Sequence, residues 1–189
     1  MTMREKVISL LDENLKTDHL YKHSLAVEAV MGALAEKLDP DNKERWAVAG
    51  LAHDLDSDLV DYKNNENHLH GIKAVEILKE NNIGDQEIYN AISAHNYETK
   101  VKPESTMAKA LYAADPITGF ITAITLVYPD KKISSVKTKS ITKRMKELRF
   151  AAGADRAAMS SIEELGIPFP EFAELSLKAM LEISDDLGL

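Results

Sequence analysis

The sequence predicts an all-α fold, a compact bundle of helices with a helical extension at its C-terminal end. Apolar residues recur at helical spacing along almost the whole chain, and no segment alternates apolar and polar residues as a half-buried strand does. No internal repeat or low-complexity linker divides the 189 residues. This length is typical of one domain. We therefore expect a single domain over residues 1–189, with a core at about 17–128 and the extension at about 131–189.

Seven helices are expected before the extension, each from its apolar spacing and its end signals. The first carries Val7 and Leu11 on one face, and the second is capped by Asp18 and ends before Pro40. A third follows Asp41 or Asn42 and runs to about residue 55, before a polar stretch at 56–67 that reads as a loop. Four more are predicted at about 68–80, 86–95 (capped by Asp85), 104–115 and 116–127, the last with Pro116 in its first turn.

The extension is expected to hold three helices, at about residues 136–150, 154–165 and 170–187. Gly153, Gly166 and Gly188 lie at or near their ends, where glycine often stops a helix. These amphipathic helices could pair subunits in a homo-oligomer or could simply bury their apolar faces in the core.

The composition excludes several kinds of chemistry. The chain has no cysteine, so it has no disulfide, iron–sulfur cluster, thiolate zinc site or cysteine nucleophile, and any metal must be held by nitrogen and oxygen. A net charge of −8 argues against a nucleic-acid polymer as partner. Charged residues interrupt the first 16 positions, and the uncharged run at 116–129 is too short for a membrane span of ~20 residues. We therefore expect a cytoplasmic protein without a membrane anchor.

Basic residues are concentrated in one segment, residues 131–156. Nine lysines and arginines are opposed there only by Glu147 and Asp155. Such a run is typical of a solvated helix, but it could also form a wall that attracts an anionic ligand. On the second interpretation, we expect phosphate contacts from Lys143, Arg144 and Arg149.

Four of the six histidines and one aspartate continue the apolar faces of predicted helices. Imidazoles and carboxylates directed inward from several helices would repel one another or stay unpaired unless a positive charge lay between them. A divalent cation meets this need, and a nitrogen and oxygen ligand set favours Fe, Mn, Co or Zn over Mg or Ca. His19 and His68 have no clear inward position and are expected at the surface or behind a ligand. The candidate ligands are His23, His53, Asp54, His70, His95 and Asp115.

The order of these residues resembles the HD-domain metal-dependent phosphohydrolase superfamily. The resemblance covers about residues 17–128 and includes the doublet His53-Asp54 in Ala-Gly-Leu-Ala-His-Asp, the pair His70-Gly71, and Ala-Ala-Asp ending at Asp115. It implies a helical HD-domain bundle in which His23, His53, Asp54 and Asp115 hold one metal. His70 and His95 match members that hold a second metal, with Asp54 bridging the two.

Two features depart from subgroups of that superfamily. Leu55-Asp56 follows the doublet where one subgroup has Ile-Gly, and the Gly-Tyr-Pro signature of cyclic-dinucleotide phosphodiesterases is absent. The resemblance therefore implies hydrolysis of a small anionic phosphorylated compound, a nucleotide or related phosphoester, by metal-activated water. Asp54 and Asp58 are the candidate catalytic acids. Asp56 and Asp58 could accept a proton or support a ligand, or they could be solvated loop residues.

Two other functions are compatible with the same residues. Some HD-fold proteins hold two irons with six such ligands and use dioxygen, so a di-iron oxygenase is one alternative. The other is a non-catalytic sensor, in which a metal, bound phosphate or nucleotide only stabilises the fold.

Overall fold

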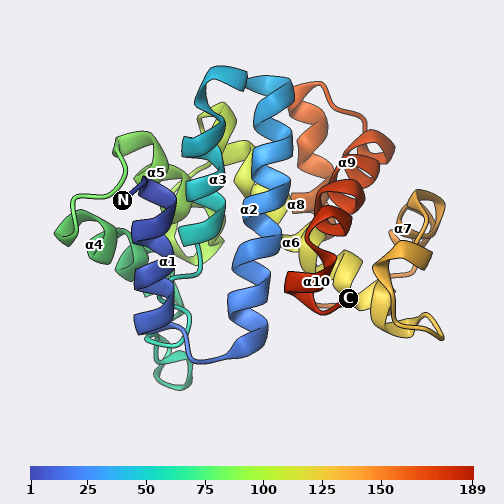
Figure 1. Ribbon diagram of the computed structural model, residues 1–189, viewed down its shortest axis with the longest axis horizontal. Coiled ribbons are helices and arrows are strands. Elements are labelled where there is room, and N and C mark those ends of the chain that lie inside the picture. The colour runs from blue at the N-terminus through green and yellow to red at the C-terminus, as the bar shows by residue number, and fades with distance from the viewer.

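The computed structural model describes all 189 residues and confirms an all-α fold, with ten α-helices, short 3-10 helices and no strand (Figure 1). The α-helices are α1 (Met3–Asn14), α2 (Asp18–Leu38), α3 (Lys43–Ala52), α4 (Ile72–Glu80), α5 (Gln86–His95), α6 (Thr106–Val127), α7 (Thr138–Arg144), α8 (Arg156–Ser160), α9 (Phe169–Glu182) and α10 (Ser184–Leu187).

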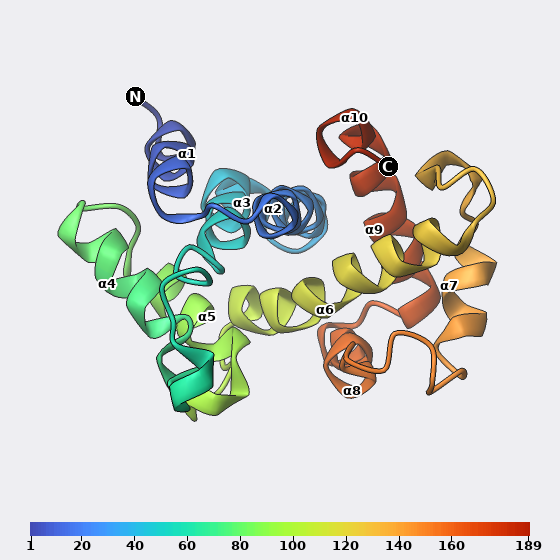
Figure 2. The same cartoon turned by 90° about the horizontal axis from the view of Figure 1, so that it is seen from below.

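Two long helices, α2 and α6, organise the fold. In Figure 2, α6 lies across the view beneath α2 and α3, and it extends from the α5 side of the molecule to the α7 side, while α2 is seen end-on. α2 packs against α3, α6 and α9, and α6 also packs against α5 and α8. One core of 46 buried residues extends from Val7 to Leu187, so the C-terminal helices pack on the same core as the N-terminal ones.

Helix ends near the histidines differ from the predicted ones. Thr17, and not Asp18, is the residue that precedes α2. α3 ends at Ala52, so His53 lies just beyond it. The predicted helix at 68–80 begins only at Ile72, because Gly71 has a φ of +86° that an α-helix cannot contain. His70 therefore lies in the turn before α4. The polar stretch at 56–67 is a loop of turns and short 3-10 helices, as predicted.

The predicted break at Pro116 is wrong, since α6 is continuous through it. Proline has no N–H to donate to the carbonyl of Tyr112 and usually breaks a helix, at a cost of ~3 kcal/mol. Here Ala113, Ala114, Ile117 and Phe120 on either side of it are all fully buried. We infer that burial along both halves outweighs the missing hydrogen bond.

α6 is also the one helix long and apolar enough to cross a membrane by length and composition. Of its most apolar window, 56% is buried inside the fold. The apolar composition is therefore accounted for by its position in the core.

The extension has shorter helices than the sequence predicts. In place of a helix over 136–150, α7 stops at Arg144 and the chain turns until α8. The guanidinium of Arg156 donates hydrogen bonds to main-chain oxygens that a longer helix would have paired with its own N–H groups. Ala151 adopts a left-handed φ of +44°. The main-chain oxygens that accept hydrogen bonds from Arg156 are those of Glu147, Phe150, Ala151 and Ala154.

The last two predicted helices are each divided in two. Asp155 caps α8 by accepting a hydrogen bond from the N–H of Ala158, and a 3-10 helix, Ser161–Leu165, continues α8. The predicted helix at 170–187 is α9 followed by α10.

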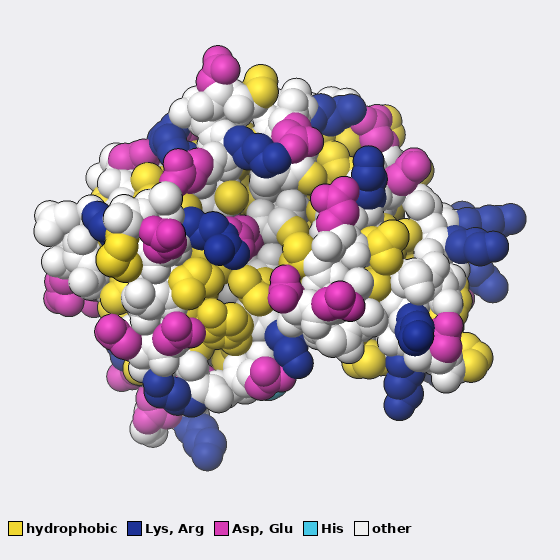
Figure 3. Space-filling model, viewed as in Figure 1, with side chains coloured by type: hydrophobic (Ala, Val, Ile, Leu, Met, Phe, Trp, Pro, Cys, Tyr) yellow, Lys and Arg dark blue, Asp and Glu magenta, His cyan; other side chains and the backbone are white.

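Lysine and arginine side chains project from the edge of the molecule where α7 lies (Figures 1 and 3). The basic segment is thus largely at the surface.

Candidate metal centre

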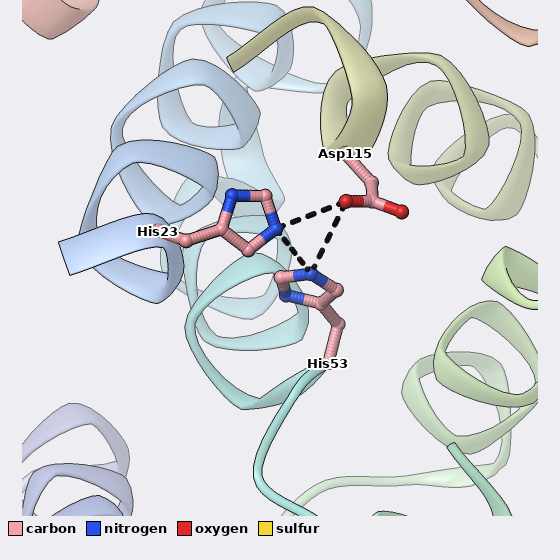
Figure 4. A group of neighbouring side chains, drawn as sticks. All are labelled: His23, His53 and Asp115. Carbon is pink, nitrogen blue, oxygen red and sulfur yellow. Dashed lines mark hydrogen bonds and ion pairs between the residues drawn. The ribbon is translucent and has the colours of Figure 1, made fainter. Parts of the chain in front are cut away.

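Six side chains converge from five parts of the fold. His23 comes from the second turn of α2, the pair His53-Asp54 from the end of α3, and Asp115 from the middle of α6. His95 is the last residue of α5, and His70 comes from the turn before α4. Figure 4 shows His23, His53 and Asp115 directed toward one point from three separate helices. All six are the residues that the sequence indicated as candidate ligands.

The side chains meet through one atom of each imidazole, Nε2. The Nε2 atom of His23 lies 3.0 Å from Oδ1 of Asp115 and 3.2 Å from Nε2 of His53. On the other side, Nε2 of His70 lies 3.1 Å from Nε2 of His95. The carboxylate of Asp54 lies between the two pairs: Oδ1 is 3.1 Å from Nε2 of His70 and 3.3 Å from that of His53, and Oδ2 is 3.6 Å from that of His23.

The other ring nitrogen, Nδ1, faces a hydrogen-bond acceptor in every case. In His53 and His95, Nδ1 donates to the main-chain oxygens of Gly50 (2.7 Å) and Ile92 (2.5 Å). In His70, Nδ1 donates to the carboxylate of Asp56 at 2.8 Å. A carbonyl or a carboxylate can only accept, so Nδ1 of these three rings carries hydrogen. When neutral, each therefore directs the lone pair of Nε2 at the centre.

His23 has the same orientation through a hydroxyl group. Thr118 Oγ1 donates its one hydrogen to the main-chain oxygen of Asp115, at 2.9 Å. The hydroxyl oxygen therefore accepts from Nδ1 of His23, which is 3.1 Å away. Its Nε2 lone pair likewise faces the centre.

This arrangement suits a cation. Two pairs of Nε2 atoms at 3.1–3.2 Å would bring lone pairs face to face if all four rings were neutral, and two carboxylates add negative charge at the same point. A buried arrangement of this kind needs positive charge at its centre. Two groups of three residues each bring their ligand atoms within 4.8 Å of one another. One group is His23, His53 and Asp115, and the other is His53, Asp54 and His95. The residues present thus fit a divalent metal ion.

Protons can supply part of that charge when no metal is bound. Burial acts to lower the pKa of His53, but the carboxylates of Asp54 and Asp115 outweigh it and raise the pKa to about 9. Burial likewise opposes protonation of His70, whose pKa is nevertheless raised to about 10 by Asp54 and Asp56. Burial would raise the pKa of Asp54, yet the surrounding imidazoles hold it well below its usual range. Protons and a metal ion therefore compete for the same position.

A comparison with protein families matches residues 20–118 to the HD domain, just over half of the chain. The chain belongs to the HD-domain family. HD domains bind divalent metals and are in general metal-dependent hydrolases, so the family and the ligand geometry agree. No curated protein and no solved structure matches the chain.

Behind the HD-domain ligands, Asp56 holds His70 in place. Besides Nδ1 of His70, its carboxylate accepts the main-chain N–H groups of Gly71 at 2.7 Å and Ala74 at 2.9 Å. Asp56 is fully buried, so its interpretation as a solvated loop acid is wrong. Gly71 is needed here because a Cβ atom would come within 2.9 Å of the Ile92 oxygen and 3.2 Å of the His95 ring. Support of a ligand is one of the roles expected for Asp56 from its position just after the doublet.

Asp58 lies outside the cluster. Its carboxylate accepts hydrogen bonds from the main-chain N–H groups of Lys16 (2.7 Å) and Thr17 (2.9 Å) and from the Thr17 hydroxyl (2.7 Å). It belongs to neither set of metal-ligand atoms and does not line the cavity described below. It stabilises the start of α2, and its catalytic role stays a prediction. His19 and His68 are exposed, as expected.

The predicted phosphate contacts are also apart from the cluster. Lys143 and Arg144 line a separate surface hollow beside Tyr128, and Arg144 forms an ion pair with Glu147 at 2.7 Å. Arg149 is exposed and lines neither cavity. Their part in substrate binding stays a prediction that the geometry does not favour.

A cavity of about 520 Å³ opens directly above the cluster, lined in part by His23, His70, His95 and Asp115. Its other walls were not predicted from the sequence, and they include Tyr97, Tyr112 and Gly119 and the segment 151–155. Tyr112, Pro116 and Gly119 share one face of α6 with Asp115, at helical spacing. Following that face from Asp115 could have found them, whereas the segment 151–155 had no such signal.

Proposed function

We propose that this HD-domain protein is a phosphohydrolase that uses one or two divalent ions, of Fe, Mn, Co or Zn, to cleave a small phosphorylated compound such as a nucleotide. The observation that carries the proposal is the convergence of four Nε2 lone pairs and two carboxylates at the floor of an open cavity. A substrate of a few hundred Å³ can reach the ligands directly from solvent.

The ligand atoms suggest how the metal would be held. His23, His53 and Asp115 would bind one ion. Support for a bridging role of Asp54 comes from its two oxygens, since Oδ1 contacts His70 and Oδ2 faces His23. His70 and His95 would complete a second position, and Asp56 and the Ile92 carbonyl fix the orientation of these two rings.

Bound there, a divalent ion would lower the pKa of its bound water to ~7 and would neutralise charge on a phosphoryl group. Phosphoryl transfer depends mainly on in-line positioning and charge neutralisation, so the chain needs no covalent nucleophile. In our proposal, Asp54 acts as a ligand and as a hydrogen-bond acceptor that orients the attacking water, because the imidazoles hold its pKa well below the usual range. The proton of the water would leave to solvent through the open cavity. The cavity walls would orient the substrate above Asp115.

The test compares substitutions of residues in the cluster with the substitution of an exposed histidine. His53→Ala and Asp54→Ala should each lose bound metal, measured by elemental analysis, and lose hydrolysis of model phosphoesters assayed with the metal that the wild type retains. His68→Ala is the matched control, because His68 is exposed and contacts no ligand; it should behave as wild type. Metal content and hydrolysis that both persist in the two inward variants would refute the proposal.

The same preparation separates the two alternative functions. A di-iron oxygenase would consume oxygen after anaerobic loading with iron and addition of substrate, and would show no phosphate release. A sensor would bind a nucleotide tightly without turnover across a broad substrate panel. Phosphate release with no oxygen consumption would favour the hydrolase over both.

A further inference from the structure

The cavity above the metal ligands offers no basic side chain. The chain has 23 lysines and arginines, yet none lines this cavity. Apart from the metal ligands, its polar wall residues are Asn96, Tyr97, Tyr112 and Asp155. The only charged group among these four at neutral pH is the carboxylate of Asp155, which is negative.

Two arginines of the neighbouring basic segment make contacts outside the cavity. The guanidinium of Arg156 donates to main-chain carbonyls of the loop and lies 4.8 Å from the centre of the Phe120 ring. Arg144 pairs with Glu147 and lies over the Phe150 ring. A phosphate placed away from the ligand cluster would therefore meet no cationic side chain in the cavity wall; Lys100 lies outside the wall, with Nζ 5.8 Å from the centre of the Tyr97 ring. Such an unpaired anion is disfavoured in a partly enclosed cavity.

One wall of the cavity is kept open by a glycine. Gly119 lies inside α6, where glycine costs about 1 kcal/mol relative to alanine. A Cβ atom there would meet no heavy atom within 4 Å, so packing does not require the glycine. Gly119 is two turns of α6 beyond Tyr112 and one turn beyond Asp115, on the face that lines the cavity. Gly119 is exposed, so the missing side chain leaves this wall of the cavity open to solvent and to a ligand.

The opposite wall is made of small residues. Ala151, Gly153, Ala154 and Ala158 line it, and Gly153 likewise has open space where a Cβ would lie. Between this wall and the face of α6 there is room for a group of ring size, bordered by the aromatic side chain of Tyr112. Such walls suit an uncharged, partly apolar group.

We propose that the substrate is a phosphomonoester with a single phosphate, whose uncharged organic group lies along α6 at Gly119, opposite the segment 151–158. This inference rests on the proposed hydrolase function and specifies its substrate class. It excludes nucleoside di- and triphosphates as preferred substrates, because no lysine or arginine lines the cavity to pair with their additional phosphates.

Binding measurements test this without turnover. The probes are the methylene phosphonate of adenosine, which cannot be hydrolysed, the matching non-hydrolysable di- and triphosphate analogues, and inorganic phosphate. Each is titrated calorimetrically into the protein carrying the metal that it retains. We expect the monophosphonate to bind at least about tenfold more tightly than the triphosphate analogue.

Substitutions locate the organic group. Gly119→Leu should weaken monophosphonate binding by at least about tenfold, while metal content and binding of inorganic phosphate stay unchanged. Gly32→Ala is the control: Gly32 lies inside α2 and lines a different hollow, and a Cβ there makes only ordinary contacts of 3.7 and 3.9 Å. It should leave all three quantities unchanged. Thermal unfolding verifies that both variants fold.

The outcomes separate this inference from the proposed function. Equal or tighter binding of the triphosphate analogue, or a Gly119→Leu variant that binds the monophosphonate as wild type does, would overturn the substrate class and leave hydrolysis intact. A metal-loaded protein that binds none of the phosphate compounds and hydrolyses none would overturn the proposed function, and the substrate class with it.

Discussion

Asp56 offers a sharp test of how the protein presents its metal ligands, because its carboxylate holds His70 from behind. In Asp56→Asn, one oxygen replaces two, and the new NH₂ group can only donate. If the oxygen stays with the N–H groups of Gly71 and Ala74, the NH₂ group faces Nδ1 of His70. Nδ1 must then accept, so the hydrogen moves to Nε2 and occupies the lone pair that a metal needs.

What the variant loses, metal affinity or folding stability, depends on the rotamer of the new amide. Removing the partner of a metal-binding histidine typically weakens metal binding about 10–100-fold, which is about 1.4–2.8 kcal/mol. In the opposite rotamer the NH₂ group would face two buried main-chain donors, and folding of the metal-free protein would then lose about 1–3 kcal/mol instead. Calorimetric titration of the metal-free protein with Zn²⁺ or Mn²⁺ measures the first quantity, and urea denaturation measures the second.

Asp58→Ala is the control for this experiment. It removes an acidic residue two positions away whose carboxylate lies outside the cluster and stabilises the start of α2. It should lower stability by about 0.5–2 kcal/mol and leave metal affinity unchanged. If Asp56→Asn binds metal as tightly as wild type, the assignment of the His70 tautomer is wrong; if Asp58→Ala abolishes hydrolysis while metal binding persists, the catalytic role predicted for Asp58 is correct.

Three further predictions follow from other contacts. The folded pKa values of His53 and His70, about 9 and 10, lie above the ordinary 6.5 of histidine. Their protonation therefore stabilises the metal-free protein fully below about pH 6.5 and is lost as pH rises through 9–10; urea denaturation of metal-free protein that shows no fall in stability over this range would contradict it. Gly50→Ala would place a Cβ 2.7 Å from the oxygen of Val27 and force α2 and α3 apart, so calorimetry should show a destabilisation of about 1–3 kcal/mol instead of the gain usual for alanine in a helix. Arg156→Lys should loosen residues 147–155, because one ammonium cannot replace the fork of donors; hydrogen exchange that stays as slow there as in wild type would count against this.

The sequence alone determined the fold class and all six candidate ligands. Helical periodicity is a local property, so a histidine at i+4 from a buried alanine can be assigned to a buried face without knowledge of the partner helix. His95 and Asp115 are assigned in this way, and both lie in the cluster. His70 is assigned by the same spacing although it precedes α4, because the turn at Gly71 still directs its ring inward. Helix lengths were less certain, as Pro116 and residues 145–155 show.

Tertiary structure alone decided what surrounds the ligands. That Asp56 supports His70 and Asp58 supports α2 depends on which main-chain donors each carboxylate meets, and those donors belong to residues up to 42 positions away. The basic segment likewise has a strong local charge, but Arg156 is turned into the loop carbonyls and the others lie at the surface or beside a different hollow. Charge and periodicity are read from neighbouring residues, whereas a tautomer, a cavity wall and a counter-charge depend on contacts between distant ones, which only the folded chain brings together.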